Sequence, residues 1–164
     1  MIRAANAAFL SALGIWVGGM ATLGFVVAPT VFRNVSSRLQ AGTIFGAVLH
    51  SFGTLQIVLA LVCLASLVAL RIAGGLSSKR AAIRIGAVAV MLVLVLVSQY
   101  YLAPNIVRER ESLVGFDSIP SGTPQKARFD RLHRLSVQVA GGTLLIGLGL
   151  LVWTASTSRP SDGA

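Results

Sequence analysis

The stretch that decides the fold is Ala87-Val88-Ala89-Val90-Met91-Leu92-Val93-Leu94-Val95-Leu96-Val97, which contains no polar side chain. A helix of a soluble protein keeps a polar face toward water, and this stretch has none. It belongs to an apolar run over residues 81–101, and a membrane-spanning helix needs about 20 mostly apolar residues. The sequence therefore predicts a transmembrane helix here.

Three further apolar runs have the same character and cover residues 4–28, 42–73 and 132–154. A chain of 164 residues has too little mass to shield four such helices from water. We therefore predict an all-α fold, a four-helix transmembrane bundle with antiparallel neighbours, as a single integral membrane domain over residues 1–164. The rest is predicted as a polar loop over 105–131 and a disordered tail over 155–164.

The composition agrees with this class, because apolar residues make up 55% of the chain and charged residues 12%. The net charge of +9 is carried at run ends and in loops, where lysine and arginine contact anionic lipid headgroups. No basic run is interleaved with aromatic residues, so we expect no nucleic-acid partner. Lysines and arginines divide almost evenly between the two sides, which leaves the orientation open. The first run is longer than a signal-peptide core and is expected to be retained.

Polar residues inside an apolar run are the first candidates for function. Gly42, Gly46, His50 and Gly53 share one helical face, and Gln56 lies on its flank. Small residues allow a neighbouring helix to come close, so we expect His50 and Gln56 inside the bundle. Two interpretations stay open, a neutral histidine hydrogen-bonded across helices and a histidine that binds a ligand or carries protons.

A second candidate is the segment 129–136, at the start of the fourth run. Asp130 and Arg134 are spaced for pairing on one helix face, and His133 lies beside them. The segment is equally typical of an interfacial helix start with arginines that reach toward the headgroups. In the first run, the glycines predicted to pack against another helix are Gly14, Gly18 and Gly19.

Catalytic signatures are missing from the sequence. It holds no Cys-x-x-Cys motif, no glycine-rich phosphate loop and no evident Ser-His-Asp set, so an enzyme is not expected. No carboxylate lies inside an apolar run, which argues against a carboxylate-driven transporter. His50 and His133 fall in the same half of the membrane. They are the candidate ligands of a metal ion or a haem, although the pattern implies neither cofactor.

Several short motifs together resemble the transmembrane protein 205-like family, whose bacterial members carry a domain of unknown function. They are Ile15-Trp16-Val17-Gly18-Gly19, Val27-Ala28-Pro29-Thr30-Val31-Phe32, Ala41-Gly42 and Phe45-Gly46 with His50, Leu102-Ala103-Pro104-Asn105, and Phe129 with Leu132-His133 and Leu135-Ser136. The resemblance implies a four-helix membrane protein in which Pro29, His133 and the small residues of the second helix are characteristic. It implies no activity.

The sequence thus predicts a multi-pass membrane protein, in a bacterial inner membrane, that binds a small ligand or a partner. The bilayer is its first partner, and a homo-oligomer or a second membrane protein is a further one. The alternative is a redox protein that holds haem or a metal through His50 and His133.

Overall fold

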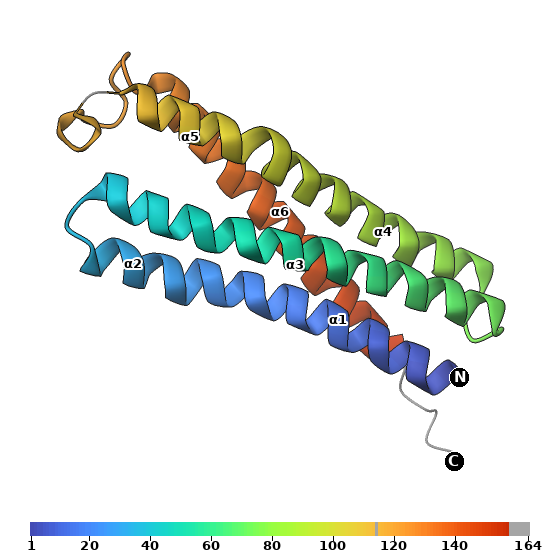
Figure 1. Cartoon of the computed structure of the whole chain (residues 1–164). Helices are drawn as coiled ribbons and strands as arrows, with labels where there is room; N and C mark the ends of the chain where they lie inside the picture. The colour runs from blue at the N-terminus through green and yellow to red at the C-terminus, as the bar shows by residue number, and fades with distance from the viewer. Residues whose placement is uncertain (114, 158–164) are drawn as a thin grey trace.

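The computed structural model describes residues 1–113 and 115–157, and four long helical segments make up most of this part of the chain (Figure 1). The first and third segments each contain a π-helical turn, whereas the second and fourth are single α-helices. Their elements are α1 (Ile2–Thr22), η1 (Leu23–Val27) and α2 (Ala28–Asn34); α3 (Arg38–Ile72); α4 (Ser78–Val97), η2 (Ser98–Leu102) and α5 (Ala103–Ser112); a 3-10 turn η3 (Phe116–Ser118); and α6 (Ala127–Thr157).

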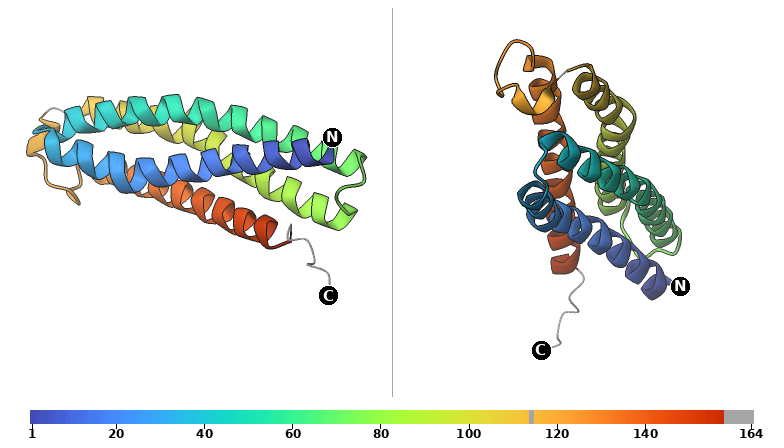
Figure 2. Two further views of the ribbon diagram at one scale, coloured as in Figure 1. Left: turned by 90° about the horizontal axis from the view of Figure 1, so that it is seen from below. Right: turned by 60° about the vertical axis from the view of Figure 1, so that its left-hand side comes forward.

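The four segments form a closed ring in which every neighbour is antiparallel (Figure 2). α1 packs against α3 and α6, and α4 packs against the same two helices. One end of the bundle holds the start of α1, the end of α3, the start of α4 and the end of α6; we call it the terminal end. The opposite end, which holds the α2–α3 connection and the segment between α5 and α6, is the loop end. The predicted four-helix antiparallel bundle is confirmed.

All four segments are long and apolar enough to cross a membrane. The core between them is small, and its largest side chains are those of Trp16, Phe9, Leu13, Leu67 and Met91. Many other apolar side chains face outward, with Phe25 76% and Leu145 70% exposed. Lipid is the solvent that accepts such a surface. The protein is therefore an integral, multi-pass membrane protein.

Two helices continue past the prolines at which the sequence predicted their ends. The first run was expected to stop at Ala28 and the third at Tyr101, yet α2 and α5 carry the helices on to Asn34 and Ser112. Each proline lies in the first turn of the new α-helix, where its missing N–H costs least. The π-helical turn before it absorbs the change of hydrogen-bond register: the amide of Ala28 donates to Leu23.

The two halves of the chain repeat this local structure. Residues 25–33 read Phe-Val-Val-Ala-Pro-Thr-Val-Phe-Arg and residues 100–108 read Tyr-Tyr-Leu-Ala-Pro-Asn-Ile-Val-Arg. The Thr30 hydroxyl donates to the carbonyl of Val26 at 2.7 Å, and the Asn105 amide donates to the carbonyl of Tyr101 at 2.6 Å. The equivalent side chain thus supports the equivalent carbonyl in each half.

The starts of α3 and α6 also differ from the expected bounds. Ser37 caps α3 by accepting the amide of Gln40, so the helix begins at Arg38 instead of Gly42. α6 begins at Ala127, within the predicted polar loop. α3 ends as predicted near Gly74, which adopts φ 73°. In the expected tail, 155–157 are helical, and 158–164 lie outside the described residues.

Candidate basic pocket at the terminal end

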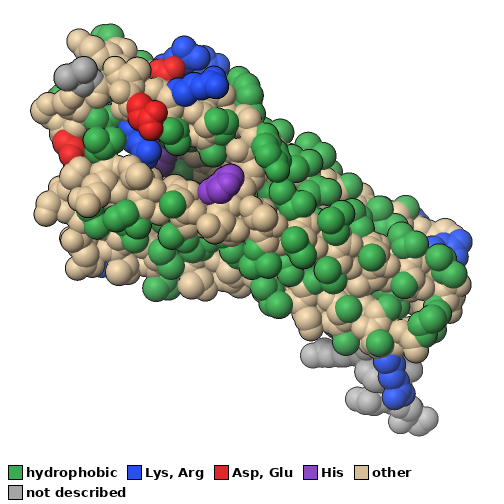
Figure 3. Space-filling model, in the orientation of Figure 1, with side chains coloured by type: hydrophobic (Ala, Val, Ile, Leu, Met, Phe, Trp, Pro, Cys, Tyr) green, Lys and Arg blue, Asp and Glu red, His purple; other side chains and the backbone are tan. Residues whose placement is uncertain are grey.

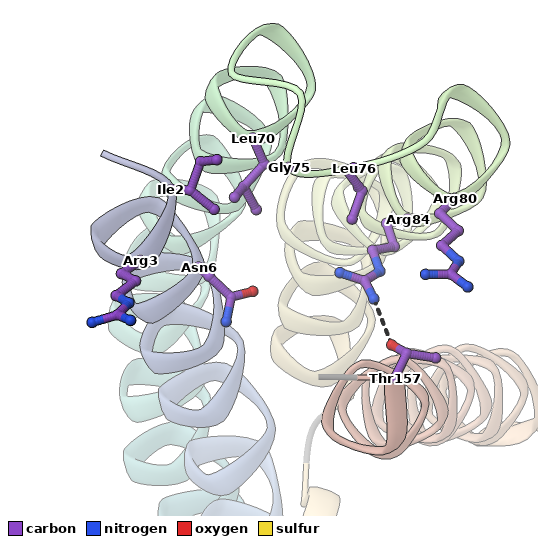
Figure 4. Close-up of a pocket in the computed structure, with 9 residues that line it drawn as sticks. All are labelled: Ile2, Arg3, Asn6, Leu70, Gly75, Leu76, Arg80, Arg84 and Thr157. Carbon is purple, nitrogen blue, oxygen red and sulfur yellow. Dashed lines mark hydrogen bonds between the residues drawn. The ribbon is translucent and has the colours of Figure 1, made fainter. Parts of the chain in front are cut away.

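A pocket of about 270 Å³ opens at the terminal end, among helices α1, α3, α4 and α6. Figure 4 shows its polar groups on three different elements: Arg3 and Asn6 come from α1, Arg80 and Arg84 from α4, and Thr157 from α6. The apolar side of the pocket is formed by Ile2, Leu70, Gly75 and Leu76. The Arg80 and Arg84 side chains both extend toward the end of α6, whereas the Arg3 side chain extends to the opposite side of α1 (Figure 4).

Arg84 is the buried member of this group, with 3% of its surface exposed. Its Nη2 donates to the Thr157 hydroxyl at 2.9 Å, and its guanidinium carbon lies 5.2 Å from the centre of the Trp153 ring (Figure 4). Its Nε is buried and has no hydrogen-bond partner in the described part of the chain. Buried polar atoms are normally hydrogen-bonded, so this atom has unused capacity to bind a ligand.

The terminal end carries positive charge without local compensation. Of the five acidic residues in the sequence, Glu109, Glu111, Asp117 and Asp130 lie at the loop end, and Asp162 is outside the described residues. On the face drawn in Figure 3, the acidic side chains gather at the loop end. The described residues therefore offer Arg84 a hydroxyl and an aromatic face but no carboxylate.

Arg71 provides a contrast at the same end. It is exposed, and its Nη2 donates to the Ser78 hydroxyl at 2.7 Å, which closes the turn between α3 and α4. It does not line the pocket. An exposed arginine of this kind stays hydrated and needs no counter-charge.

Of the residues predicted as a site from sequence, those on α6 and His50 lie toward the loop end, and Gln56 lies in the middle of α3. Gln56 is buried on α3 as expected, whereas His50 is exposed. α3 and α5 diverge at this end, so a residue on the inner face of α3 is not covered there (Figure 1). The His50 carbonyl accepts the side-chain amide of Gln99, a residue of η2, at 2.9 Å.

Asp130 and Arg134 do not form the pair expected from their spacing. The Asp130 carboxylate accepts the backbone amide of Gly122 at 2.7 Å, and Arg134 is exposed. A backbone donor in a turn is fixed in place, whereas an exposed ion pair contributes little. His133 is also exposed, and its ring stacks on Phe129 with centroids 5.9 Å apart and planes at 3°.

The segment between α5 and α6 is held by two further groups. Lys126, which is 3% exposed, donates to the carbonyls of Phe116 and Ile119 at 2.8 and 3.0 Å. Asp117 reaches the start of α3, where it accepts hydrogen bonds from the Ser37 hydroxyl and from the Leu39 amide, the latter at 2.9 Å. These bonds hold the pKa of Asp117 below its usual value, because they stabilise the carboxylate.

The glycines predicted for helix packing fall into two groups. A methyl group added to Gly19, Gly42 or Gly53 would meet a side chain of another helix: those of Phe52, Arg110 and Gln99, respectively. At Gly14, Gly18 and Gly46 it would meet no other atom within 4 Å.

From the sequence, His50 and His133 were the candidate ligands of a metal ion or a haem, with neither cofactor implied. Among the described residues, no group of three or more histidine, cysteine, aspartate or glutamate side chains gathers in a way that would hold a metal ion. A metal or haem at this end would therefore have two histidines as its strongest protein ligands.

The sequence model of one known family matches more than half of the chain. The sequence model of DUF4149, a domain of unknown function, matches residues 11–112. The chain belongs to the DUF4149 family. The match runs from the middle of α1 to the end of α5 and includes both Ala-Pro segments with their π-helical turns. Neither curated proteins nor solved structures give a match.

The basic pocket was not among the sites predicted from the sequence. Arg80 and Arg84 are spaced four apart near the start of a helix, a pattern typical of ordinary interfacial anchoring. Nothing in the spacing showed that the end of α6 would cover Arg84 and bury it. The available signal was the excess of arginine over acidic residues at one end.

Proposed function

We propose that this membrane protein binds the anionic, phosphate-bearing headgroup of a lipid in the basic pocket at the terminal end. The observation that carries the proposal is the Arg84 guanidinium, which is buried, has a free Nε, and lines a pocket together with Arg80. An unpaired buried cation is unfavourable by several kcal/mol. A phosphate group would supply the missing charge and accept the free N–H.

The chemistry of arginine favours this class of ligand. The planar guanidinium presents several donors in a fork that matches two oxygens of a phosphate, and it is weakly hydrated compared with an ammonium. Asn6 and Thr157 add neutral polar groups that suit the ester or hydroxyl oxygens of a headgroup. The apolar wall formed by Ile2 and Leu76 fits the start of an acyl chain.

The depth of the pocket supports a lipid as the source of the phosphate. The segment Ser78–Ser112 has 35 residues, which at about 1.5 Å per residue is longer than the bilayer core of about 30 Å. Its ends therefore lie at headgroup level, and Arg84 is within two turns of one end. Basic pockets at this level between transmembrane helices are typical of anionic-lipid sites.

The test compares lipid binding by native protein with that of Arg84→Met. The protein is placed in nanodiscs of phosphatidylcholine alone or of an equal mixture with phosphatidylglycerol. Native mass spectrometry of the released protein then measures which lipids stay bound to it. Charge-assisted hydrogen bonds contribute about 1.5–3 kcal/mol each. We therefore expect Arg84→Met to retain phosphatidylglycerol about tenfold less or worse. The control Arg71→Met removes an exposed charge from the same end and should bind like native protein.

If both variants lose phosphatidylglycerol binding equally, this binding depends on general surface charge, and the proposal is wrong. Equal retention by native protein and Arg84→Met would also overturn it. Retention of phosphatidylcholine at the same level as phosphatidylglycerol would exclude a headgroup-charge preference.

Haem or metal binding by His50 and His133 remains the alternative function. The two residues lie on α3 and α6, toward the same end of the bundle. An ultraviolet–visible spectrum and metal analysis of protein purified in mild detergent test it. A Soret band or stoichiometric metal that is lost in His50→Ala and His133→Ala would support this alternative.

We also propose the narrower family, the location and the assembly that the sequence suggests. We infer a relationship to the transmembrane protein 205-like family, a place in a bacterial inner membrane, and assembly with a second copy or another membrane protein. The outward apolar surface supports contact with lipid, and cross-linking in native membranes tests for the protein partner.

A further inference from the structure

We infer a second oxyanion site at the loop end, centred on Arg110. Arg110 lies near the end of α5 and is 8% exposed. Its Nε is buried without a hydrogen-bond partner, and within the described residues the guanidinium forms neither a hydrogen bond nor an ion pair. This guanidinium is therefore less satisfied than that of Arg84, which at least donates to Thr157.

Acidic residues are close in the chain, yet three of them are already engaged elsewhere. Glu109 pairs with Arg128 at 3.0 Å. Asp117 accepts the Leu39 amide, and Asp130 accepts the Gly122 amide. Glu111, the next residue along α5, is exposed. The positive charge of Arg110 is thus left for a group that the described chain does not supply.

The position of Arg110 is set by a glycine on the neighbouring helix. Its Nη1 lies 3.2 Å from the point that a Cβ at Gly42 would occupy, so the guanidinium is directed at the first turns of α3. Figure 3 shows a recess at this end of the bundle, with histidine and basic side chains beside it. The segment around Lys126 is fixed by its two backbone hydrogen bonds and borders the same end.

The ligand that fits is an oxyanion, either a carboxylate or a phosphate. The guanidinium fork offers two parallel N–H groups to such a planar or tetrahedral acceptor. Arg110 lies in the last turn of a membrane-spanning segment, so the oxyanion has two sources: a lipid headgroup in this leaflet, or a small anion from the adjoining aqueous side. This site is separate from the basic pocket, because the two lie at opposite ends of the segment Ser78–Ser112.

The test titrates purified protein in a neutral detergent with inorganic phosphate and, separately, with acetate, by calorimetry in the Arg84→Met background. That background removes the buried guanidinium of the terminal-end pocket, so failure of one proposal is distinguishable from failure of the other. We expect one remaining site whose affinity falls at least tenfold in Arg110→Met. Arg108→Met removes an exposed charge from the same helix and should change the affinity less than twofold.

A second pair of variants keeps the arginine, in case Arg110→Met does not fold. Gly42→Ala places a methyl against Nη1 and should weaken the site severalfold, whereas Gly46→Ala meets no atom within 4 Å and should leave it unchanged. If neither anion binds, phosphatidylglycerol nanodiscs decide whether the site takes a headgroup instead. The inference is wrong if Arg110→Met and Gly42→Ala bind phosphate, acetate and phosphatidylglycerol as the Arg84→Met protein does.

Discussion

Gly147 provides the sharpest test of how the helices pack. It is buried on α6, and a Cβ at this position would lie 2.7 Å from Cγ2 of Val17 on α1 and 3.0 Å from Cε of Met91 on α4. Gly149, on the same helix, would meet no atom within 4 Å. Changing each glycine to alanine therefore adds the same methyl group to the same helix in two different surroundings.

The expected difference follows from these distances. Nonbonded carbon atoms normally lie about 3.5–4.0 Å apart, so the new methyl is about 1 Å too close to Val17. Met91 can turn its flexible end away, but a helical valine has essentially one rotamer. The helices must separate, and overpacking of this kind costs about 1–3 kcal/mol. Alanine also favours the helix by up to about 1 kcal/mol, a gain that both variants share.

We expect Gly147→Ala to be less stable than Gly149→Ala by about 1–3 kcal/mol. The free energy of unfolding is measured by titrating dodecyl maltoside micelles with sodium dodecyl sulfate and following circular dichroism. Trp16, which precedes Val17 in the core, gives an independent fluorescence signal. If the free energies of unfolding of the two variants agree within about 0.5 kcal/mol, the usual limit of additivity, α1 and α6 do not make this close contact.

Three further results are expected. Because the pKa of Asp117 is lowered, its carboxylate stabilises the loop end at pH values above the ordinary pKa of about 3.9, and this stabilisation is lost as the pH falls through the lowered pKa. Hydrogen exchange at the start of α3 should therefore rise below about pH 4 in native protein relative to Asp117→Asn. Equal exchange in the two proteins would contradict the contact. Gly53→Ala should destabilise native protein but not the Gln99→Ala variant, and a double-mutant cycle without coupling would refute this. Cys63 is fully buried, so maleimide should label it only as the protein unfolds, and fast labelling in mild detergent would place it at the surface.

The sequence predicted the number and order of the helices because each apolar run exceeds the length of a membrane span. It misplaced the ends at Pro29 and Pro104, since a proline normally ends or kinks a helix. The structure instead inserts a π-helical turn before each proline, and the side chains of Thr30 and Asn105 support the carbonyls there. That solution depends on hydrogen-bond register, which apolar periodicity does not report.

The candidate sites were harder to predict, because burial of a charged residue depends on helices distant in sequence. His50 was expected inside the bundle from its helical face, but the neighbouring helix diverges at that level and leaves it exposed. Arg84 and Arg110 looked like interfacial anchors, yet both are buried by contacts that form only when the bundle closes. Gln56, in the middle of its helix where all neighbours are close, was placed correctly.

The distribution of acidic residues argues that counter-charges for the buried arginines come from outside the described chain. At the loop end, carboxylates are present but Asp117 and Asp130 bind backbone amides, and Glu109 binds Arg128. At the terminal end, the described residues include no carboxylate at all. Keeping a guanidinium buried in either place is unfavourable unless an anion joins it. A bilayer with anionic lipids supplies such groups at both ends of the same membrane-spanning segment. The free energy of unfolding should therefore rise with the phosphatidylglycerol content of the membrane, and it should rise less in Arg84→Met.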